Sequence, residues 1–161
     1  MPCTIRPATE ADFDAMWNIF HAVVSTGRTY VYAPDTTKAQ CHTILMTNTH
    51  PFVAEKNGQI VGLFVIRSNH QGLGSHVCNA GFMVCPEHRR KGIGRAMGEH
   101  ALVQAKELGY RAMQFNVVVS TNKASIALWK SLGFTIIGTV PDAFDHADEG
   151  LVAIHIMHRF L

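Results

Sequence analysis

The sequence predicts an α/β fold whose strands and helices follow the order βααβββαβαββ, and three observations lead to this prediction. The chain has 161 residues, of which 47% are hydrophobic and 16% charged, so it can bury one sizeable core. Segments with the alternating apolar pattern of strands are interleaved with segments of helical period. No repeat, low-complexity tract or Pro/Ser-rich linker interrupts the chain, so residues 1–161 are expected to form a single domain.

The first part of the chain is expected to contain one strand and two helices. Cys3–Arg6 is typical of a short strand, and Thr9 followed by Asp12 resembles the capping pattern that begins a helix. A second helix is expected from Thr36 or Thr37 to about Thr47. Apolar residues at helical spacing predict the buried face of the first helix, and they are Phe13, Met16, Trp17, Phe20 and Val24.

A β-hairpin follows, because Asn57-Gly58 separates two strand-like segments, Pro51–Glu55 and Gln59–Ser68. Asn-Gly tolerates the positive φ angles of a two-residue turn. This order of elements includes at least one parallel strand-helix-strand crossover, and ligands of such sheets bind at the C-terminal ends of strands. The remaining expected elements are a strand from His76 to Cys85, a helix after Pro86 ending near Leu108, a strand from Arg111 to Val119, a helix from Asn122 to Leu132, and strands from Phe134 to Val140 and from Leu151 to Phe160 joined by an acidic loop.

Charge and hydropathy exclude two classes of partner. Lys and Arg total 14 against 12 Asp and Glu, a net charge of +2, without the basic excess typical of nucleic-acid-binding proteins. Apolar runs such as Ile60–Ile66 are much shorter than the roughly 20 residues that span a bilayer, and Met1–Asp14 has no signal-peptide pattern. We therefore expect no nucleic acid or membrane partner and a cytoplasmic location.

The Cys and His residues predict neither a disulfide framework nor a metal site. His155 and His158 are separated by an odd number of residues in an alternating stretch, so they are expected on opposite faces of a strand. The cysteines are widely spaced and form no C-x-x-C pair, which favours free thiols in a reducing cytoplasm. They are Cys3, Cys41, Cys78 and Cys85.

The segment from Pro86 to Arg95 carries the clearest functional signal. It joins an apolar strand, Gly81–Val84, to an amphipathic helix, and Gly92 and Gly94 allow consecutive N–H groups and the helix dipole to converge on one point. A Walker loop would need Ser or Thr after Gly-Lys, and the third glycine of a dinucleotide fingerprint is misplaced. We expect an anion such as a pyrophosphate, the alternative being a Gly-rich turn with a solvated basic run. The basic residues there are Arg89, Arg90, Lys91 and Arg95.

At residues 89–94, Arg-Arg-Lys-Gly-Ile-Gly, the sequence resembles the signature of the GCN5-related N-acetyltransferase (GNAT) superfamily. The resemblance continues through Asn122–Phe134, with the family's asparagine, amphipathic helix and Leu-Gly-Phe ending, and the order of elements extends it over essentially the whole chain. It implies the GNAT fold, a central mixed twisted sheet of about seven strands flanked by four helices. It also implies acetyl-CoA as co-substrate without a metal, direct acetyl transfer to an amine, and a homodimer formed through C-terminal strands.

The resemblance implies which residues bind coenzyme A. Backbone N–H groups of Arg90–Arg95 would hold the pyrophosphate, and the main chain of Phe82–Val84 would pair with the pantetheine arm. A β-bulge in this strand would aim the N–H of Met83 or Val84 at the thioester oxygen. The cofactor-binding residues implied in this way are Phe82, Met83, Val84, Arg89, Arg90, Lys91, Gly92, Ile93, Gly94, Arg95, Asn122, Ser125 and Trp129.

A narrower resemblance, carried by Cys78–Phe82, Phe115–Val118 and Thr121-Asn122, is to the yeast-type proline-analogue (L-azetidine-2-carboxylate) N-acetyltransferases. It implies that two asparagines on neighbouring strands bind the substrate carboxylate. The alternative is that Asn116 only satisfies neighbouring backbone and that Asn122 is only a helix cap. The residues expected to bind substrate are Asn79, Asn116 and Tyr30, and those expected at the reaction centre are Asn122 and Asn79.

The proton-transfer groups are not identified by the sequence. Trp129 stands where many relatives have a tyrosine, and an indole N–H is not a proton donor for a thiolate. Either another group protonates the thiolate or no acid is needed, and we favour the second option because thiol pKa values are about 8.5. The bases considered for the amine are His76 and the acidic loop, namely Asp142, Asp145, His146, Asp148 and Glu149.

These observations favour an enzyme that transfers the acetyl group of acetyl-CoA directly to the amine of a small amino or imino acid resembling a proline analogue. Two alternatives stay open. The first is a protein or peptide N-acetyltransferase, and the second is a non-catalytic acyl-CoA-binding module.

Overall fold

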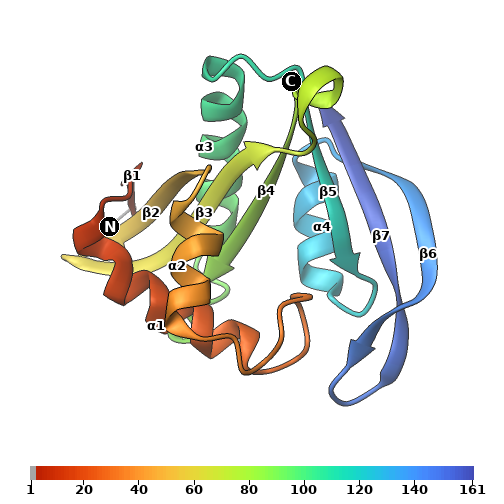
Figure 1. The fold of residues 1–161 in the computed structure, drawn as a ribbon, viewed down its shortest axis with the longest axis horizontal. Helices are drawn as coiled ribbons and strands as arrows, with labels where there is room; N and C mark the ends of the chain where they lie inside the picture. Colours follow the sequence, from red (N-terminus) through yellow and green to blue (C-terminus); the bar gives the residue numbers. More distant parts are fainter. Residues whose placement is uncertain (1–2) are drawn as a thin grey trace.

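The computed structural model describes residues 3–161, whose strands form one seven-stranded mixed sheet in the order β1-β2-β3-β4-β5-β7-β6 (Figure 1). The predicted α/β fold and its order of elements are confirmed. Met1 and Pro2, which begin the expected domain, lie outside the described residues. The strands are β1 (Thr4–Pro7), β2 (His50–Lys56), β3 (Gln59–Ser68), β4 (Val77–Val84), β5 (Ala112–Val119), β6 (Thr135–His146) and β7 (Gly150–Phe160), and the helices are α1 (Phe13–Val24), α2 (Lys38–Met46), α3 (Ile93–Glu107) and α4 (Lys123–Ser131).

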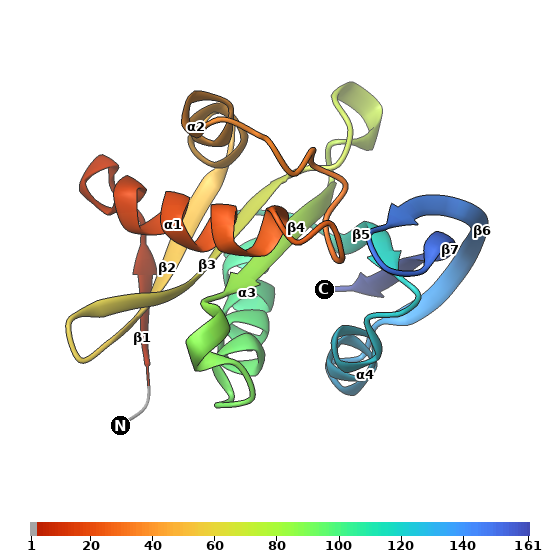
Figure 2. The same cartoon turned by 90° about the horizontal axis from the view of Figure 1, so that it is seen from below.

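Helices cover both faces of the sheet, with α1 and α2 on one face and α3 and α4 on the other (Figure 2). Successive residues of β3 point to opposite faces. Leu63 and Val65 therefore join the core beside α1, whereas Phe64 and Ile66 join the core beside α3. No helix in the described range combines the length and the apolar character that crossing a membrane requires.

β4 and β5 are neighbours in the sheet but pair over only a short stretch. The parallel register consists of Val77 opposite Ala112 and Cys78 opposite Met113. Beyond these pairs the two strands diverge, as Figure 1 shows. The rings of Phe82, Phe115 and Trp129 pack against one another beneath the divergence, with centroids 4.7–6.1 Å apart. The edge of β4 after Cys78 therefore has no partner strand.

Two expectations about strand geometry are wrong. The bulge expected in β4 is absent from the described β3–β4 register, which runs without a shift from Gly62–Val84 to Ser68–Cys78. Hydrogen bonds to β3 keep β4 a regular strand. The other edge of β4 is open because β5 diverges from it. The expected acidic loop is shorter than predicted, because β6 continues to His146. Asp142, at φ 49°, lies in a β-bulge that keeps β6 paired with β7.

The short β6–β7 turn contacts the segment that follows α1. The N–H of Ala147 donates to the carbonyl of Gly27 at 3.0 Å, and Arg28 forms an ion pair with Asp148 at 2.7 Å. These contacts hold the segment after α1, which also carries Tyr30, against the β6–β7 turn.

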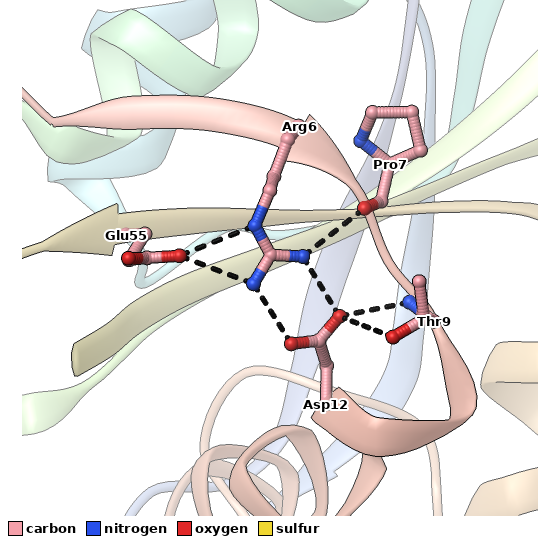
Figure 3. Close-up of polar contacts among 5 residues, drawn as sticks. All are labelled: Arg6, Pro7, Thr9, Asp12 and Glu55. Atoms are coloured by element: carbon pink, nitrogen blue, oxygen red, sulfur yellow. Dashed lines mark hydrogen bonds and ion pairs between the residues drawn. The ribbon is translucent and has the colours of Figure 1, made fainter. Parts of the chain in front are cut away.

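The N-terminal strand is tied to the first helical turn by Arg6. Its guanidinium donates to both carboxylate oxygens of Asp12, at 2.8 and 2.9 Å, and to Glu55 of β2 (Figure 3). The N–H of Thr9 also donates to Asp12, at 2.8 Å, as the capping pattern predicts. The hydrogen bonds from Arg6, followed by those from Thr9, hold the pKa of the Asp12 carboxyl far below its ordinary value.

Candidate active site between β4 and β5

The loop between β4 and α3 has the geometry of an anion-binding site. Gly92 is the N-cap of α3 with φ 78°, and Arg90 also has a positive φ of 59°. No acceptor within residues 3–161 takes a hydrogen bond from the N–H groups of residues 90–95. The helix dipole adds partial positive charge at the same point. A phosphate-sized anion fits this set of unpaired donors.

The basic side chains of this loop differ in how much they are already engaged. Lys91 donates to the carbonyl of Glu87 at 2.9 Å, and Arg95 donates to the hydroxyl of Ser131 at 2.8 Å. Arg89 and Arg90 are exposed, and their side chains make no ion pair or hydrogen bond within the described part of the chain. These two guanidinium groups therefore remain available to a ligand. Ile93, which is 3% exposed, anchors the first turn of α3 in the core.

The main-chain groups of β4 are divided between its two edges. The N–H of Cys85 donates to the carbonyl of Val61 at 2.9 Å, on the β3 side. Consecutive N–H groups in an extended strand point to opposite edges, so the N–H groups of Val84 and Phe82 point toward the open edge. That of Met83 points toward β3. Of the two donors left open by the sequence, only Val84 presents its N–H at the open edge.

Tyr30 already contacts the open edge of β4. Its hydroxyl donates to the carbonyl of Phe82 and accepts from the N–H of the same residue. Burial is the main cause that raises the pKa of the Tyr30 hydroxyl above its ordinary value, so the phenol stays protonated. Tyr32 stacks on Tyr30, with ring centroids 6.0 Å apart. Tyr30, which the sequence predicts to bind substrate, therefore lies against the open edge of β4.

The two asparagines expected to bind substrate are both hydrogen-bonded. The Asn79 side chain donates to the carbonyl of Gln114 at 3.0 Å, across the point where β4 and β5 diverge. Asn116 donates to the side-chain oxygen of Asn69 at 2.7 Å and accepts from the side chain of Gln114 at 2.9 Å. These residues form one amide cluster at the start of the divergence. Sequence reasoning missed Asn69, although Gln114 could have been included because it shares a strand face with Asn116.

The three residues expected on α4 have different surroundings. Asn122 is the N-cap, and its side-chain oxygen accepts from the N–H of Ser125 at 3.3 Å. This is the helix-cap alternative considered for Asn122, although its amide N–H₂ has no acceptor within residues 3–161. Trp129 is 6% exposed and packs in the aromatic cluster under Phe82. Its indole therefore supports β4 on the face that α4 covers.

The groups considered as bases lie mainly around the β6–β7 turn. His146 is 7% exposed, and its Nδ1 accepts from the N–H of Asp148 at 3.2 Å. Asp148 is held by Arg28, whose hydrogen bond lowers the pKa of that carboxyl. The other acidic residues of this region, Asp142, Asp145 and Glu149, are exposed, as is His76 before β4. Only His146 is both buried and connected through the turn to the segment carrying Tyr30.

Cys41, Cys78 and Cys85 are not activated as nucleophiles. Burial raises the pKa of the Cys41 and Cys78 thiols to about 12, so neither is a thiolate near neutral pH. Cys85 donates to the Glu87 carboxylate at 2.8 Å, and its pKa is also raised, chiefly by desolvation. All four cysteines are free, as predicted. No three His, Cys, Asp or Glu side chains come together as metal ligands between residues 3 and 161.

Comparisons with known proteins place this geometry in a family. Residues 13–134 match the model of the acetyltransferase (GNAT) family. The N-acetyltransferase aca1 of Schizosaccharomyces pombe is 45% identical over 84 residues, covering 52% of this chain but only 40% of that protein. The L-methionine sulfoximine/L-methionine sulfone acetyltransferase of Salmonella typhimurium is 31% identical over 144 residues, covering 86% of this chain and 83% of the relative.

A solved structure resembles the whole described fold. The GCN5-related N-acetyltransferase from Kribbella flavida superposes with a TM-score of 0.95 at 41% identity, and the alignment covers 99% of this chain and 98% of that one. The motif of residues 89–94, the splayed strands and the family match therefore agree: this chain belongs to the acetyltransferase (GNAT) family.

Proposed function

We propose that this protein transfers the acetyl group of acetyl-CoA directly to the amine of a small amino or imino acid. The observation that carries the proposal is the divergence of β4 from β5 after Cys78–Met113, next to the unpaired N–H groups of residues 90–95. One feature supplies an open strand edge and the other an anion site. A long ligand with a pyrophosphate at one end and an amide-containing arm matches both.

The described residues fit coenzyme A. The N–H groups of residues 90–95 and the free guanidinium groups of Arg89 and Arg90 would hold the pyrophosphate, and the open edge at Val84 would pair with the arm. When bound, acetyl-CoA supplies an activated acyl group as a thioester. The N–H of Val84 is the donor that we assign to the thioester oxygen, because such a donor stabilises negative charge developing there.

The remaining tasks are to orient the amine and to accept its proton. His146 uses its Nδ1 lone pair for the N–H of Asp148, and a neutral imidazole has only one such lone pair, so we assign the amine proton to solvent in the gap between β4 and β5. Trp129 occupies the position where many relatives have a tyrosine, so we propose that the thiolate leaves without a general acid. The amide cluster of Asn69, Asn79, Gln114 and Asn116 leaves hydrogen-bond donors and acceptors in the gap between β4 and β5. These groups suit a small polar molecule that receives the acetyl group.

The substrate class is proposed from two sources. A relative in Salmonella typhimurium that aligns over most of this chain is named for acetylating L-methionine sulfoximine and L-methionine sulfone. The narrower resemblance at Cys78–Phe82 points to imino acids such as azetidine-2-carboxylate. Both are small molecules that carry an amine and a carboxylate, so we propose this common class.

Release of free thiol from acetyl-CoA tests the proposal. The acceptor panel contains L-azetidine-2-carboxylate, proline, L-methionine sulfone, other free amino acids and short peptides. We expect turnover with one or more free amino or imino acids and none with Gly94→Asp, whose carboxylate opposes an anion at the start of α3. Turnover with peptides alone would establish the protein N-acetyltransferase alternative, and coenzyme A binding without turnover on any amine would establish the non-catalytic one.

We also propose a homodimer that uses the C-terminal strands. β6 is an edge strand of the sheet, and Ile137 on β6 and Leu151 on β7 are 58% and 62% exposed. Exposed apolar residues beside an unpaired strand edge favour association. Light scattering should give a dimer mass for the wild type and a monomer mass for Ile137→Lys. A monomeric wild type would refute this part.

A further inference from the structure

Arg67, near the end of β3, has a buried donor without a partner. Its Nε is inaccessible to solvent, and no acceptor within residues 3–161 lies at hydrogen-bond distance. Arg67 also forms no ion pair with a described carboxylate, whereas Arg6, Arg28 and Arg95 each do. An arginine keeps its proton at any physiological pH, so it cannot avoid the cost of a buried unpaired N–H by becoming neutral. The arrangement indicates that a ligand supplies the missing acceptor.

The register of the sheet places Arg67 beside the amide cluster. Arg67 lies directly opposite Asn79 in the antiparallel β3–β4 pair, so the two side chains leave the same face. This is the face of Leu63 and Val65, which pack against α1. The Asn79 amide N–H₂ is neutral and already donates one of its two hydrogens to the Gln114 carbonyl. The guanidinium of Arg67 is therefore the stronger free anion-binding group at this position.

Gly81 and Tyr30 lie on the same face as Arg67 and Asn79, further along β4 toward Phe82. Gly81 is two residues after Asn79, and a Cβ added there would lie 3.8 Å from the Tyr30 ring. The positive charge of Arg67 is close enough to act on the Tyr30 hydroxyl, lowering a pKa that burial raises. Arg67 and Asn79 thus lie one position along the same face from Gly81, and the Tyr30 ring lies over Gly81.

The chemistry of Arg67 selects a carboxylate. A planar guanidinium binds both oxygens of a carboxylate through parallel N–H donors. In an α-amino acid the amine is attached to the carbon next to the carboxylate. Asn79, which is opposite Arg67, and Phe82, which contacts Tyr30, are three residues apart, about 10 Å along a strand. A carboxylate at Arg67 therefore leaves the amine on the side of Tyr30 and Phe82.

We propose that Arg67 binds the α-carboxylate of the acetyl acceptor and so restricts the enzyme to free amino or imino acids. The inference rests on the proposed function and assigns the carboxylate to Arg67 instead of to the pair Asn79 and Asn116. It also explains why a buried donor is left without a protein partner: a polar group reserved for a ligand costs stability in the free protein.

Paired acceptors test the proposal. For each amino acid that is acetylated, kcat/KM is measured for the acid and for its carboxamide, in the wild type and in Arg67→Gln, Arg67→Lys and Arg111→Gln. Arg111 is exposed and lies just before β5, so it is the matched control. We expect the wild type to prefer the acid and Arg67→Gln to lose roughly 100-fold on the acid alone, mainly through KM, since one partner of a buried charge pair is removed. Arg67→Lys should recover part of this loss, and the KM for acetyl-CoA should not change.

Equal acetylation of acid and carboxamide by the wild type, or equal losses in Arg67→Gln and Arg111→Gln, would overturn the assignment of Arg67 while leaving the acetyltransferase function in place. If the wild type acetylates no amine, the proposed function fails, and binding decides the role of Arg67. Calorimetry with coenzyme A present then compares an N-acetyl amino acid with its methyl ester. Arg67→Gln must weaken only the binding of the free acid, and its unfolding midpoint in urea must not fall below that of the wild type.

Discussion

The hydroxyl of Tyr30 donates to the carbonyl oxygen of Phe82 at 2.5 Å and accepts from the N–H of the same residue at 2.9 Å, although the two residues are far apart in the sequence. Both main-chain groups lie at the edge of β4 that β5 leaves open. The side chain therefore satisfies two polar groups that would otherwise be unpaired in the free protein. The same two groups belong to the strand that the family resemblance assigns to the pantetheine arm.

Removal of this hydroxyl should affect the free protein more than the complex with coenzyme A. Tyr30→Phe leaves the Phe82 N–H and carbonyl unpaired, which should lower the free energy of unfolding by about 1–3 kcal/mol. If the cofactor arm pairs with this edge, the loss shrinks in saturating coenzyme A, and the affinity for coenzyme A rises. Urea unfolding with and without coenzyme A measures both effects.

Tyr32→Phe is the matched control for Tyr30→Phe. Tyr32 stacks on Tyr30, but its hydroxyl has no hydrogen-bond partner within residues 3–161. We expect a change below about 0.5 kcal/mol, as for substitutions away from specific interactions. An equal loss for Tyr30→Phe in the free and bound protein would show that the arm does not use this edge.

Gly92→Ala should weaken coenzyme A binding by distorting the start of α3. Gly92 has φ 78°, and nothing lies within 4 Å of an added Cβ, so the substitution introduces backbone strain without a clash. The expected cost is about 1 kcal/mol of stability and roughly a tenfold loss of coenzyme A affinity, comparable with one hydrogen bond to a charged group. Isothermal calorimetry measures the affinity.

Gly58→Ala separates backbone strain from ligand binding. Gly58, in the β2–β3 turn, has φ 73° and also has nothing within 4 Å of an added Cβ. Its loss of stability should match that of Gly92→Ala, whereas its affinity for coenzyme A should equal that of the wild type. Equal affinities in the two variants would contradict the assignment of the anion site to residues 90–95.

Gly98→Ala should destabilise the packing of α3 against α4. A Cβ at Gly98 would lie 2.6 Å from Cδ1 of Leu132 and 3.1 Å from Cζ3 of Trp129. Overpacking of this kind costs about 1–3 kcal/mol. In the same helix, Gly94→Ala would place its Cβ at an ordinary 3.5 Å from Leu128, so it should unfold at the same or higher urea concentration. A Gly98→Ala variant as stable as Gly94→Ala would refute this close helix contact.

Asp12→Asn should lower stability in a pH-dependent way. The Asp12 carboxyl has a depressed pKa in the folded protein because of its hydrogen bonds from Arg6. As pH falls, the unfolded state binds the proton first, near its ordinary pKa of about 3.9. The stabilisation is therefore complete above that pH and is lost as pH falls toward the folded pKa. Loss of charged hydrogen bonds predicts about 2 kcal/mol at neutral pH, less any screening of the partly exposed Arg6.

The control for this pair is Asp14→Asn, because Asp14 pairs with Lys38 but its side chain is 83% exposed. Its effect should be near zero at every pH, as for most surface ion pairs. Urea unfolding of the wild type and both variants from pH 7 to pH 3 measures the difference. A constant gap between wild type and Asp12→Asn over this range would contradict the role of the carboxylate.

Local signals explain why much of the fold and the conformation of the glycine loop before α3 could be predicted. The Asn57-Gly58 turn adopts the positive φ angles, 52° and 73°, that identify a hairpin from sequence. Gly92 likewise has the left-handed conformation that a turn into a helix N-terminus uses. In both cases the neighbouring residues along the chain determine the geometry, so no distant contact is needed to infer it.

The candidate acceptor site was less predictable because its contacts join distant segments. Asn79 and Asn116 were expected to share a gap, yet their side-chain nitrogens donate to different residues, Gln114 and Asn69. The pairing of β4 with β5 and the loop after β3, which carries Asn69, bring these amides together. The extension of β6 to His146 was missed because its acidic residues, typical of a loop, are accommodated by a bulge against β7.

The sequence by itself determined the order of elements, the hairpin and the basic glycine loop that begins α3, since propensity and spacing act between near neighbours. Only the tertiary structure decided that Tyr30 contacts Phe82, that Val84 and not Met83 presents its N–H at the open edge, and that Arg67 is left with a buried, unpaired donor. These features depend on strand register and on which segments meet across the sheet. Register is decided by the packing of whole faces, so it is not contained in any short stretch of residues.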